Sequence, residues 1–172
     1  MRRIASQMVY EGQIARVRID EFRHDDGSVA RREVVAHPGA VAIVPYDSDQ
    51  VYLVRQPREA VGEPSLLEVP AGKLDVPGET PLECAKRELA EEAGKAATTW
   101  RELKRFYTSP GFIEEEVIVF LATDLSDVEH EPDPEERLEI VPWPLAELDG
   151  AIEECNDSKS LIGLLVLRDL LR

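Results

Sequence analysis

The chain has 172 residues, in which 35 aspartates and glutamates outnumber 20 lysines and arginines to give a formal net charge of −15. This length is enough for one compact domain with a small appendage, and 43% hydrophobic with 32% charged residues is typical of a soluble globular protein. So acidic a chain is not expected to bind nucleic acid or an anionic membrane as its main activity.

Cysteine content and the N-terminus favour a cytoplasmic protein. Cys84 and Cys155 are too few for a disulfide framework and lack the spacing of metal ligands. The first residues contain no apolar run of signal-peptide length, and no stretch is long enough to span a membrane. We therefore expect a cytoplasmic location and no membrane partner.

The N-terminal residues predict antiparallel β structure. Residues 13–23 alternate between apolar and polar, residues 25–27 form a turn signal, and residues 28–36 return as a second strand. Such a hairpin buries little surface alone. We expect the rest of the chain or a second subunit to cover it, and hence a homodimer.

A boundary at His37–Gly39 divides the chain into an N-terminal β region, residues 1–38, and a main domain, residues 39–172. Hydrophobic patterning predicts strands over residues 40–45, 50–55, 66–69, 100–108, 116–123 and 137–143, and helices over residues 144–154 and 158–172. The packing residues expected of the last helix are Leu161, Leu164, Leu165, Leu167 and Leu171. Strands on both sides of a central helix, with a closing helix, predict an α/β sheet between helical layers.

The main domain is organised around a loop and a short acidic helix, residues 72–94. Thr80 is a suitable N-cap, Pro81 fits the first helical position, and Glu83 completes a capping box. Gly94 is placed to end the helix in the left-handed conformation.

Three carboxylates lie within one arc of this helix: Glu88, Glu91 and Glu92. They repel one another and crowd the helix C-terminus, where the dipole disfavours anions. A bound divalent cation would reconcile them, and hard oxygen ligands suit Mg²⁺ or Mn²⁺. The alternative is a solvated acidic helix face.

The stretch resembles the box that defines the Nudix family, G-x5-E-x7-R-E-U-x-E-E-x-G-U, in which U is a bulky aliphatic residue. The fixed positions are filled by Gly72, Glu79, Arg87, Glu88, Leu89, Glu91, Glu92 and Gly94. The loop before Glu79 carries one extra residue, within Val76–Gly78, and Lys95 replaces the last aliphatic residue. The resemblance covers residues 39–172.

The resemblance implies the Nudix α/β/α sandwich with a mixed sheet, preceded here by a small antiparallel β region. That region is similar to the N-terminal part of ADP-ribose pyrophosphatases, where it helps to build a dimer and part of the substrate site. Family precedent implies that Glu88, Glu92 and the carbonyl of Ala71 hold the metal, with Glu91 bridging or supporting them. Glu79 and Arg87 are expected to pair and hold the loop against the helix.

The resemblance places the general base in a loop before the last strand. Glu136 matches a family carboxylate and Glu135 is its neighbour, and either could take a proton from water. A merely solvated acidic loop is the alternative. Glu115 is a third candidate, although its position after a Pro-Gly pair suggests contact with a ribose hydroxyl.

Three stretches outside the box resemble substrate-binding parts of ADP-ribose pyrophosphatases. Pro110 lies sixteen residues after Gly94, where this subfamily has a proline. Arg58 matches an arginine that contacts phosphate, for which the planar guanidinium is well suited. Arg32 matches an arginine that stacks on adenine, and Ile14 occupies the position opposite, where the family often has an aromatic residue.

The sequence therefore predicts Mg²⁺-dependent hydrolysis of ADP-ribose to AMP and ribose 5-phosphate. One alternative is a hydrolase of other nucleoside-diphosphate sugars or of oxidised nucleotides. Another is a Nudix-fold sensor that binds ADP-ribose without cleaving it. The retained box carboxylates and the lack of a basic extension argue against the sensor.

Overall fold

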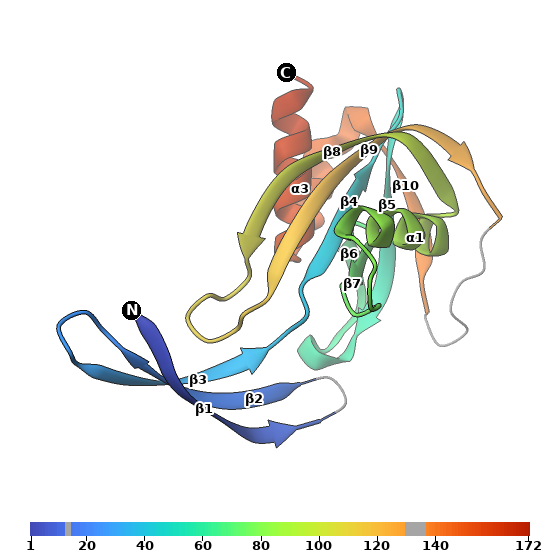
Figure 1. The fold of residues 1–172 in the computed structure, drawn as a ribbon. Coiled ribbons are helices and arrows are strands. Elements are labelled where there is room, and N and C mark those ends of the chain that lie inside the picture. Colours follow the sequence, from blue (N-terminus) through green and yellow to red (C-terminus); the bar gives the residue numbers. More distant parts are fainter. Residues whose placement is uncertain (13–14, 130–136) are drawn as a thin grey trace. The chain divides into compact units, whose positions relative to one another are not determined.

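A computed structural model describes residues 1–12, 15–129 and 137–172. Its contacts divide the chain into two compact units (Figure 1). The first unit comprises Met1–Gly39 and Phe106–Glu116, and the second comprises Ala40–Arg105 and Val117–Arg172. The separate domains 1–38 and 39–172 stay a prediction. The grouping of residues 106–116 with the N-terminal residues was not anticipated.

The first unit contains a three-stranded antiparallel sheet in the order β1-β2-β3. Its strands are β1 (Arg2–Glu11), β2 (Arg16–Arg23) and β3 (Val29–Ala36). The predicted hairpin corresponds to β2 and β3, but β1 was missed. Nearly every residue of β1 is exposed, so its sequence lacks the alternation that a half-buried strand shows.

Residues 106–116 attach to β3 through the backbone. The Val35 N–H donates to the Phe112 carbonyl at 2.8 Å, and the Glu114 N–H donates to the Val35 carbonyl at 3.1 Å. Val35 and Ile113 form an isolated parallel bridge. Residues 106–116, called the Pro110 segment below, therefore pair with β3 at the edge of the N-terminal sheet.

The second unit is built on two sheets, ordered β7-β4-β9-β8 and β10-β5-β6. The strands are β4 (Ala40–Pro45), β5 (Gln50–Arg58), β6 (Glu63–Glu68), β7 (Ala71–Lys73), β8 (Lys95–Tyr107), β9 (Glu116–Asp127) and β10 (Glu139–Pro144). Two single 3-10 turns occupy Glu59–Val61 and Leu145–Glu147. Because β4 pairs parallel with β9 and antiparallel with β7, the four-stranded sheet is mixed.

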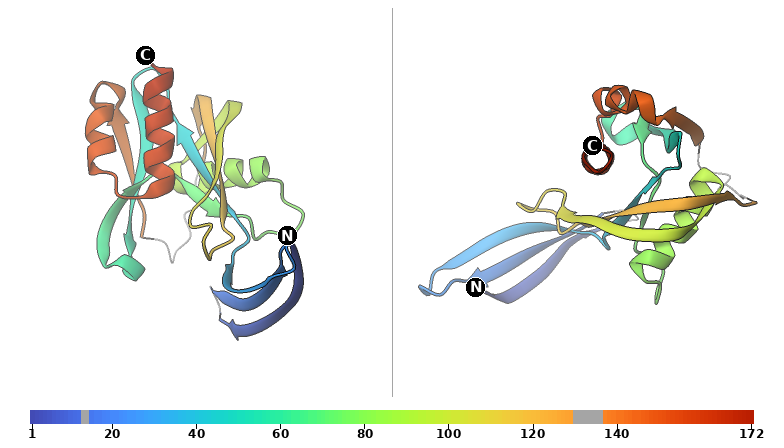
Figure 2. Two further views of the ribbon diagram at one scale, coloured as in Figure 1. Left: turned by 90° about the vertical axis from the view of Figure 1, so that its left-hand side faces the viewer. Right: turned by 90° about the horizontal axis from the view of Figure 1, so that it is seen from above.

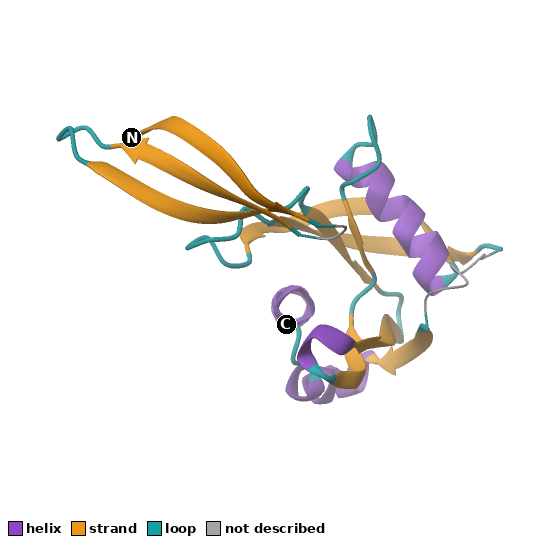
Figure 3. Cartoon of the chain, turned by 90° about the horizontal axis from the view of Figure 1, so that it is seen from below, coloured by secondary structure: helices purple, strands orange, loops and turns teal. Residues whose placement is uncertain are grey.

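Helices cover both faces of the four-stranded sheet, as Figures 2 and 3 show. Helix α1 (Pro81–Ala93) packs Leu89 in a fully buried cluster with Val41 and Ile118. Helix α3 (Ser158–Leu170) presents Gly163, whose Cβ would lie 2.7 Å from Val44. Val41 and Val44 point to opposite faces because successive residues of a strand alternate. The predicted α/β/α layering is present.

The C-terminal helices differ slightly from the prediction. Helix α2 (Leu148–Glu154) packs against α3 and ends where predicted, but it begins four residues later than predicted, after the 3-10 turn Leu145–Glu147. Leu164 and Leu167 are fully buried, as expected, whereas Leu171 is 47% exposed because α3 ends at Leu170. No helix among the described residues is long and apolar enough to cross a membrane.

Candidate active site

Local sequence signals set both ends of α1. The Thr80 hydroxyl accepts a hydrogen bond from the Glu83 N–H at 3.3 Å, and the Glu83 carboxylate accepts from the Thr80 N–H at 2.8 Å. Pro81 opens the helix, and Gly94 ends it at φ 61°. The predicted capping box and glycine cap are thus confirmed.

The extra residue before Glu79 is absorbed in a tight turn. The Glu79 N–H donates to the Val76 carbonyl at 3.2 Å, and Gly78 has φ +86°, a conformation that favours glycine. Glu79 still reaches Arg87, whose Nε and Nη2 donate to its two oxygens at 2.9 and 3.1 Å. The expected pairing of loop and helix is therefore formed despite the insertion.

Lys95, which replaces the aliphatic residue at the end of the box, has partners of its own. Its Nζ lies 4.4 Å from the centre of the Tyr52 ring and donates to Asp127 at 2.5 Å. A cation over an aromatic face and an ion pair together stabilise a half-buried ammonium group. The departure from the box pattern thus has a local structural explanation.

Arg87 also donates hydrogen bonds to two of the three carboxylates on the helix face. Its Nη1 donates to Glu88 at 2.7 Å and to Glu91 at 2.9 Å. The hydrogen bond with Glu79, followed by the charges of these neighbours, raises the pKa of Arg87, and Arg87 lowers the pKa of Glu79. A guanidinium therefore offsets part of the repulsion that suggested a metal, so charge repulsion alone does not require one.

Glu88 and Glu92 both lie against the backbone of Ala71 and Gly72. The Ala71 N–H donates to Glu92, which is only 4% exposed, at 2.8 Å. A Cβ at Gly72 would lie 1.9 Å from Glu88 Oε1, so glycine is what allows this carboxylate to pack there. Two carboxylates thus converge on the backbone whose carbonyl was predicted to join them as a metal ligand.

The candidate metal ligands, the carboxylates of Glu88 and Glu92 and the carbonyl of Ala71, all offer oxygen atoms. Oxygen ligands suit a hard cation such as Mg²⁺ or Mn²⁺. Among the residues that the structure describes, no three His, Cys, Asp or Glu side chains already lie in the geometry of a metal site. Glu88, Glu92 and the Ala71 carbonyl thus match such a cation in ligand type, whereas the geometry of a complete metal site is not formed among the described residues.

Arg58, the predicted phosphate ligand, is paired with a carboxylate that the sequence reading missed. Its Nε and Nη2 donate to the two oxygens of Glu68 at 2.6 and 2.8 Å. Lys159 donates to Glu68 Oε2 at 2.5 Å. Although burial raises the pKa of Glu68, which is 1% exposed, hydrogen bonds from Arg58 and Lys159 bring it below its usual value. The sequence signal that could have indicated this buried carboxylate is the single glutamate in the otherwise apolar run Leu66–Val69.

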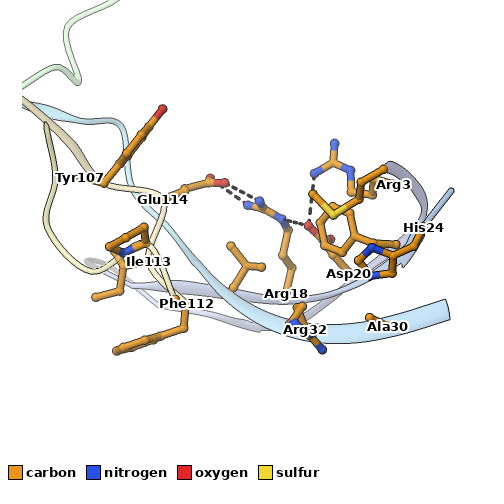
Figure 4. A pocket seen from close by; sticks show the side chains of 15 residues that line it. Arg3, Arg18, Asp20, His24, Ala30, Arg32, Tyr107, Phe112, Ile113 and Glu114 are labelled. Carbon is orange, nitrogen blue, oxygen red and sulfur yellow. Dashed lines mark hydrogen bonds and ion pairs between the residues drawn. The ribbon is translucent and has the colours of Figure 1, made fainter. Parts of the chain in front are cut away.

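The first unit holds Arg32 and Glu115. Glu115 accepts a hydrogen bond from Thr108 Oγ1 at 2.8 Å and lies 3.5 Å from His37 Nδ1. Arg32 lines an open cavity of about 700 Å³ together with Pro110 (Figure 4). Ile14, Glu135 and Glu136 lie outside the described residues.

An ion-pair network on β2 faces the same cavity and was not foreseen. The guanidinium of Arg18 binds Glu114 through two hydrogen bonds and donates from Nε to Asp20 at 2.9 Å (Figure 4). Burial raises the pKa of Asp20, but hydrogen bonds with Ser6, Arg18 and Arg3 lower it by more, so the net shift of this pKa is downward. Arg18 thereby ties the Pro110 segment to the N-terminal sheet.

Comparison with known proteins places this arrangement in a family. The NUDIX domain family matches residues 36–162, which is most of the chain. The chain belongs to the Nudix family. This confirms the family expected from the box, and it confirms that the protein is an enzyme of the Nudix hydrolase type.

Individual Nudix relatives support the same placement. The chain is 36% identical over 170 residues to ADP-ribose pyrophosphatase from Bacillus subtilis, covering 96% of this chain and 91% of that protein. It is 46% identical over 126 residues to ADP-ribose pyrophosphatase from Mycobacterium tuberculosis, covering 73% of this chain and 60% of that protein. A crystal structure of an ADP compounds hydrolase superposes with a TM-score of 0.85 at 28% identity, covering 99% of this chain and 93% of that one. The predicted Nudix fold class is therefore confirmed.

Proposed function

We propose that this Nudix protein hydrolyses the pyrophosphate bond of ADP-ribose, giving AMP and ribose 5-phosphate, with Mg²⁺ or alternatively Mn²⁺ as cofactor. The observation that carries the proposal is that one short stretch, residues 68–71, holds both Arg58, a phosphate-binding type of residue, through Glu68, and the box carboxylate Glu92, through the Ala71 N–H. Relatives named ADP-ribose pyrophosphatase support the choice of substrate.

In this proposal Glu88, Glu92 and the Ala71 carbonyl hold the metal, and Glu91 bridges or supports it. A divalent ion there supplies charge neutralisation for the pyrophosphate oxygens and a water that is nucleophilic at neutral pH. The protein residues do the positioning. Arg87 holds Glu79, Glu88 and Glu91 in one network, and the Ala71 N–H orients Glu92.

Arg58 is assigned to the substrate phosphates. With Nε and Nη2 committed to Glu68, its Nη1 makes no hydrogen bond to a described residue. The side chain is 42% exposed, so part of it is accessible to a ligand. Planar guanidinium groups bind phosphate oxygens with directional hydrogen bonds.

The nucleoside is assigned to the first unit, with Arg32 and Ile14 at the adenine and Glu115 at a ribose hydroxyl. Arg32 lines a cavity together with the aromatic residues Phe22, Tyr107 and Phe112. Aromatic and guanidinium groups suit a nucleobase because both stack on its π face.

A homodimer in the cytoplasm is part of the proposal. The first unit exposes large apolar side chains, among them Met8, Val9, Tyr10 and Phe112. A partner copy would cover this apolar surface. Light scattering after gel filtration tests it, and a monomer would contradict it.

Glu136 is our choice of general base, with Glu135 as its neighbour and Glu91 as a residue of the metal site. The Glu136→Gln variant should lower kcat far more than it changes KM, because a base acts on the reacting water. An effect confined to KM would reassign Glu136 to substrate contact.

The direct test is hydrolysis of a panel of nucleotide sugars with Mg²⁺. ADP-ribose should be cleaved faster than GDP-mannose and ADP-glucose. Equal or slower cleavage of ADP-ribose would favour the broader nucleoside-diphosphate-sugar or oxidised-nucleotide hydrolase. Tight binding without cleavage would favour the sensor, which the intact set of box carboxylates makes the weaker alternative.

A further inference from the structure

Glu68 is a buried charge with an unusually complete set of partners. It ends β6 with 1% of its surface exposed, and it accepts hydrogen bonds from Arg58 at both oxygens and from Lys159 at Oε2. A buried carboxylate is costly unless it is paired and hydrogen-bonded. Two cations on one carboxylate satisfy that requirement and leave Glu68 fixed in place.

Lys159 reaches Glu68 from the far end of the chain. It lies in the first turn of α3, is only 15% exposed, and also contacts Asp157 at 2.9 Å. Asp157 caps the helix by accepting from the N–H and the hydroxyl of Ser160, at 2.9 and 2.6 Å. The position of Lys159 is therefore set by the helix cap.

The N-terminal end of α3 also binds the backbone directly after Glu68. The Val69 N–H donates to Ser160 Oγ at 2.8 Å, a bond that is buried. Two residues further on, the Ala71 N–H holds Glu92. One short stretch, residues 68–71, thus fixes the arginine assigned to phosphate and a carboxylate assigned to metal.

We infer that Lys159, acting through Glu68, is a positioning residue for Arg58, so that the N-terminus of α3 sets the affinity of the site for the pyrophosphate group of its substrate. Lys159 shares the Glu68 carboxylate with Arg58 and also offsets the charge of Asp157. Without it, Glu68 would hold Arg58 more strongly, and Arg58, Glu68 and Asp157 together would carry one net negative charge. Both effects weaken binding of an anionic substrate.

The inference rests on the proposed function, and Lys95 provides a matched control for it. Lys95 is also half-buried, at 19% exposed, and also donates to a carboxylate at 2.5 Å, but its partner is Asp127. The two lysines are similarly buried, but Asp127 is 88% exposed and Glu68 only 1%, so Lys159→Met should lower thermal stability more than Lys95→Met. A purely structural role of Lys159 would end at that loss of stability and leave substrate affinity unchanged.

Steady-state kinetics with ADP-ribose and Mg²⁺ test the role in positioning. Lys159→Met should raise KM about tenfold with kcat within about twofold, since a misplaced charge-assisted hydrogen bond is worth on the order of 1.4 kcal/mol. Lys159→Arg, which keeps the cation, should restore most of the affinity, and Lys95→Met should leave KM unchanged. Equal KM changes in both methionine variants, or a Lys159→Met effect confined to kcat, would overturn the inference.

Calorimetric titration with inorganic pyrophosphate and Mg²⁺ separates this inference from the choice of substrate. Lys159→Met should bind pyrophosphate about tenfold more weakly than the unmodified protein. If ADP-ribose is not cleaved but this difference is found, the substrate assignment fails and the inference stands. If the unmodified protein binds no pyrophosphate, or the variant binds it equally well, the inference fails.

Discussion

Two charged clusters in the second unit have opposite stoichiometry. In the first, one cation, Arg87, forms ion pairs with three carboxylates, those of Glu79, Glu88 and Glu91. In the second, one carboxylate, Glu68, forms ion pairs with two cations, Arg58 and Lys159. The first cluster retains excess negative charge even with its arginine in place, whereas the second has two cations and, with Asp157 beside Lys159, two carboxylates, and its Arg58 side chain is partly exposed. The first is thus suited to a cation and the second to a phosphate.

The clusters also differ in burial. The shared carboxylate Glu68 is 1% exposed, whereas the shared cation Arg87 is 31% exposed; the most exposed members, Arg58 at 42% and Glu91 at 45%, are similar in the two clusters. Water screens the more exposed pairs, so they contribute less to folding and can be rearranged at lower cost. The buried cluster is expected to hold its geometry, and the exposed one to exchange partners when a metal binds.

Replacing Glu92 with glutamine should have the largest effect. The amide oxygen of the new side chain can still accept from the Ala71 N–H, so we expect the fold to survive. Turnover should fall about 100-fold or more, since metal stabilisation of the transition-state charge is worth several kcal/mol. Glu153→Gln, an exposed change on α2, is the control in both activity and thermal unfolding. A near-normal rate for Glu92→Gln would contradict the metal assignment.

The carboxylate cluster around Arg87 could be foreseen because it is local. Thr80, Glu83 and Gly94 define the helix ends by contacts within a few residues, and the helix then places Glu88, Glu91 and Arg87 together. The Glu68 cluster could not be foreseen in the same way. Lys159 lies 91 residues from Glu68, so only the folded sheet and the docked helix bring them together.

Replacing Gly72 with alanine separates metal geometry from folding. The new methyl group would lie 1.9 Å from Glu88 Oε1 and 2.3 Å from its Cγ, so the Glu88 side chain must adopt another rotamer. We expect about a tenfold or greater loss of turnover with a small loss of stability, because catalytic groups tolerate little displacement. Gly150→Ala, where a Cβ meets only Trp143 at 3.6 Å, is the control. Unchanged turnover would show that the position of Glu88 is not critical.

Replacing Arg87 with methionine should release Glu79, Glu88 and Glu91 together. We expect a loss of about 2 kcal/mol in the free energy of unfolding, from hydrogen bonds to charged groups that are partly screened. Added Mg²⁺ should then raise the melting temperature more in the variant than in the unmodified protein, because the competing cation is gone. Equal increments in both proteins would indicate that Arg87 and the metal do not share these carboxylates.

The first unit shows a second limit of sequence reading. Its outer strand β1 was missed because both of its faces are exposed, which removes the alternating pattern. The attachment of residues 106–116 to β3 depends on backbone hydrogen bonds between Val35 and residues far along the chain. Backbone pairing of this kind leaves little trace in side-chain identity, although Pro110 itself marked the segment as important.

The buried cluster should make a small, pH-dependent contribution to stability. Hydrogen bonds from Arg58 and Lys159 hold the pKa of Glu68 below the ordinary glutamate value of 4.5, so the charged form is favoured on folding. The stabilisation is therefore fully present above about pH 4.5 and is lost as the pH falls through the lower folded-state pKa. Glu68→Gln should be about 1 kcal/mol less stable at pH 7, because neutral hydrogen bonds replace charged ones. The difference should shrink below about pH 4, as measured by urea unfolding, whereas the exposed change Glu102→Gln should show little difference at either pH. A Glu68→Gln deficit that is the same at neutral and at acidic pH would mean that the charge on Glu68 does not stabilise the fold.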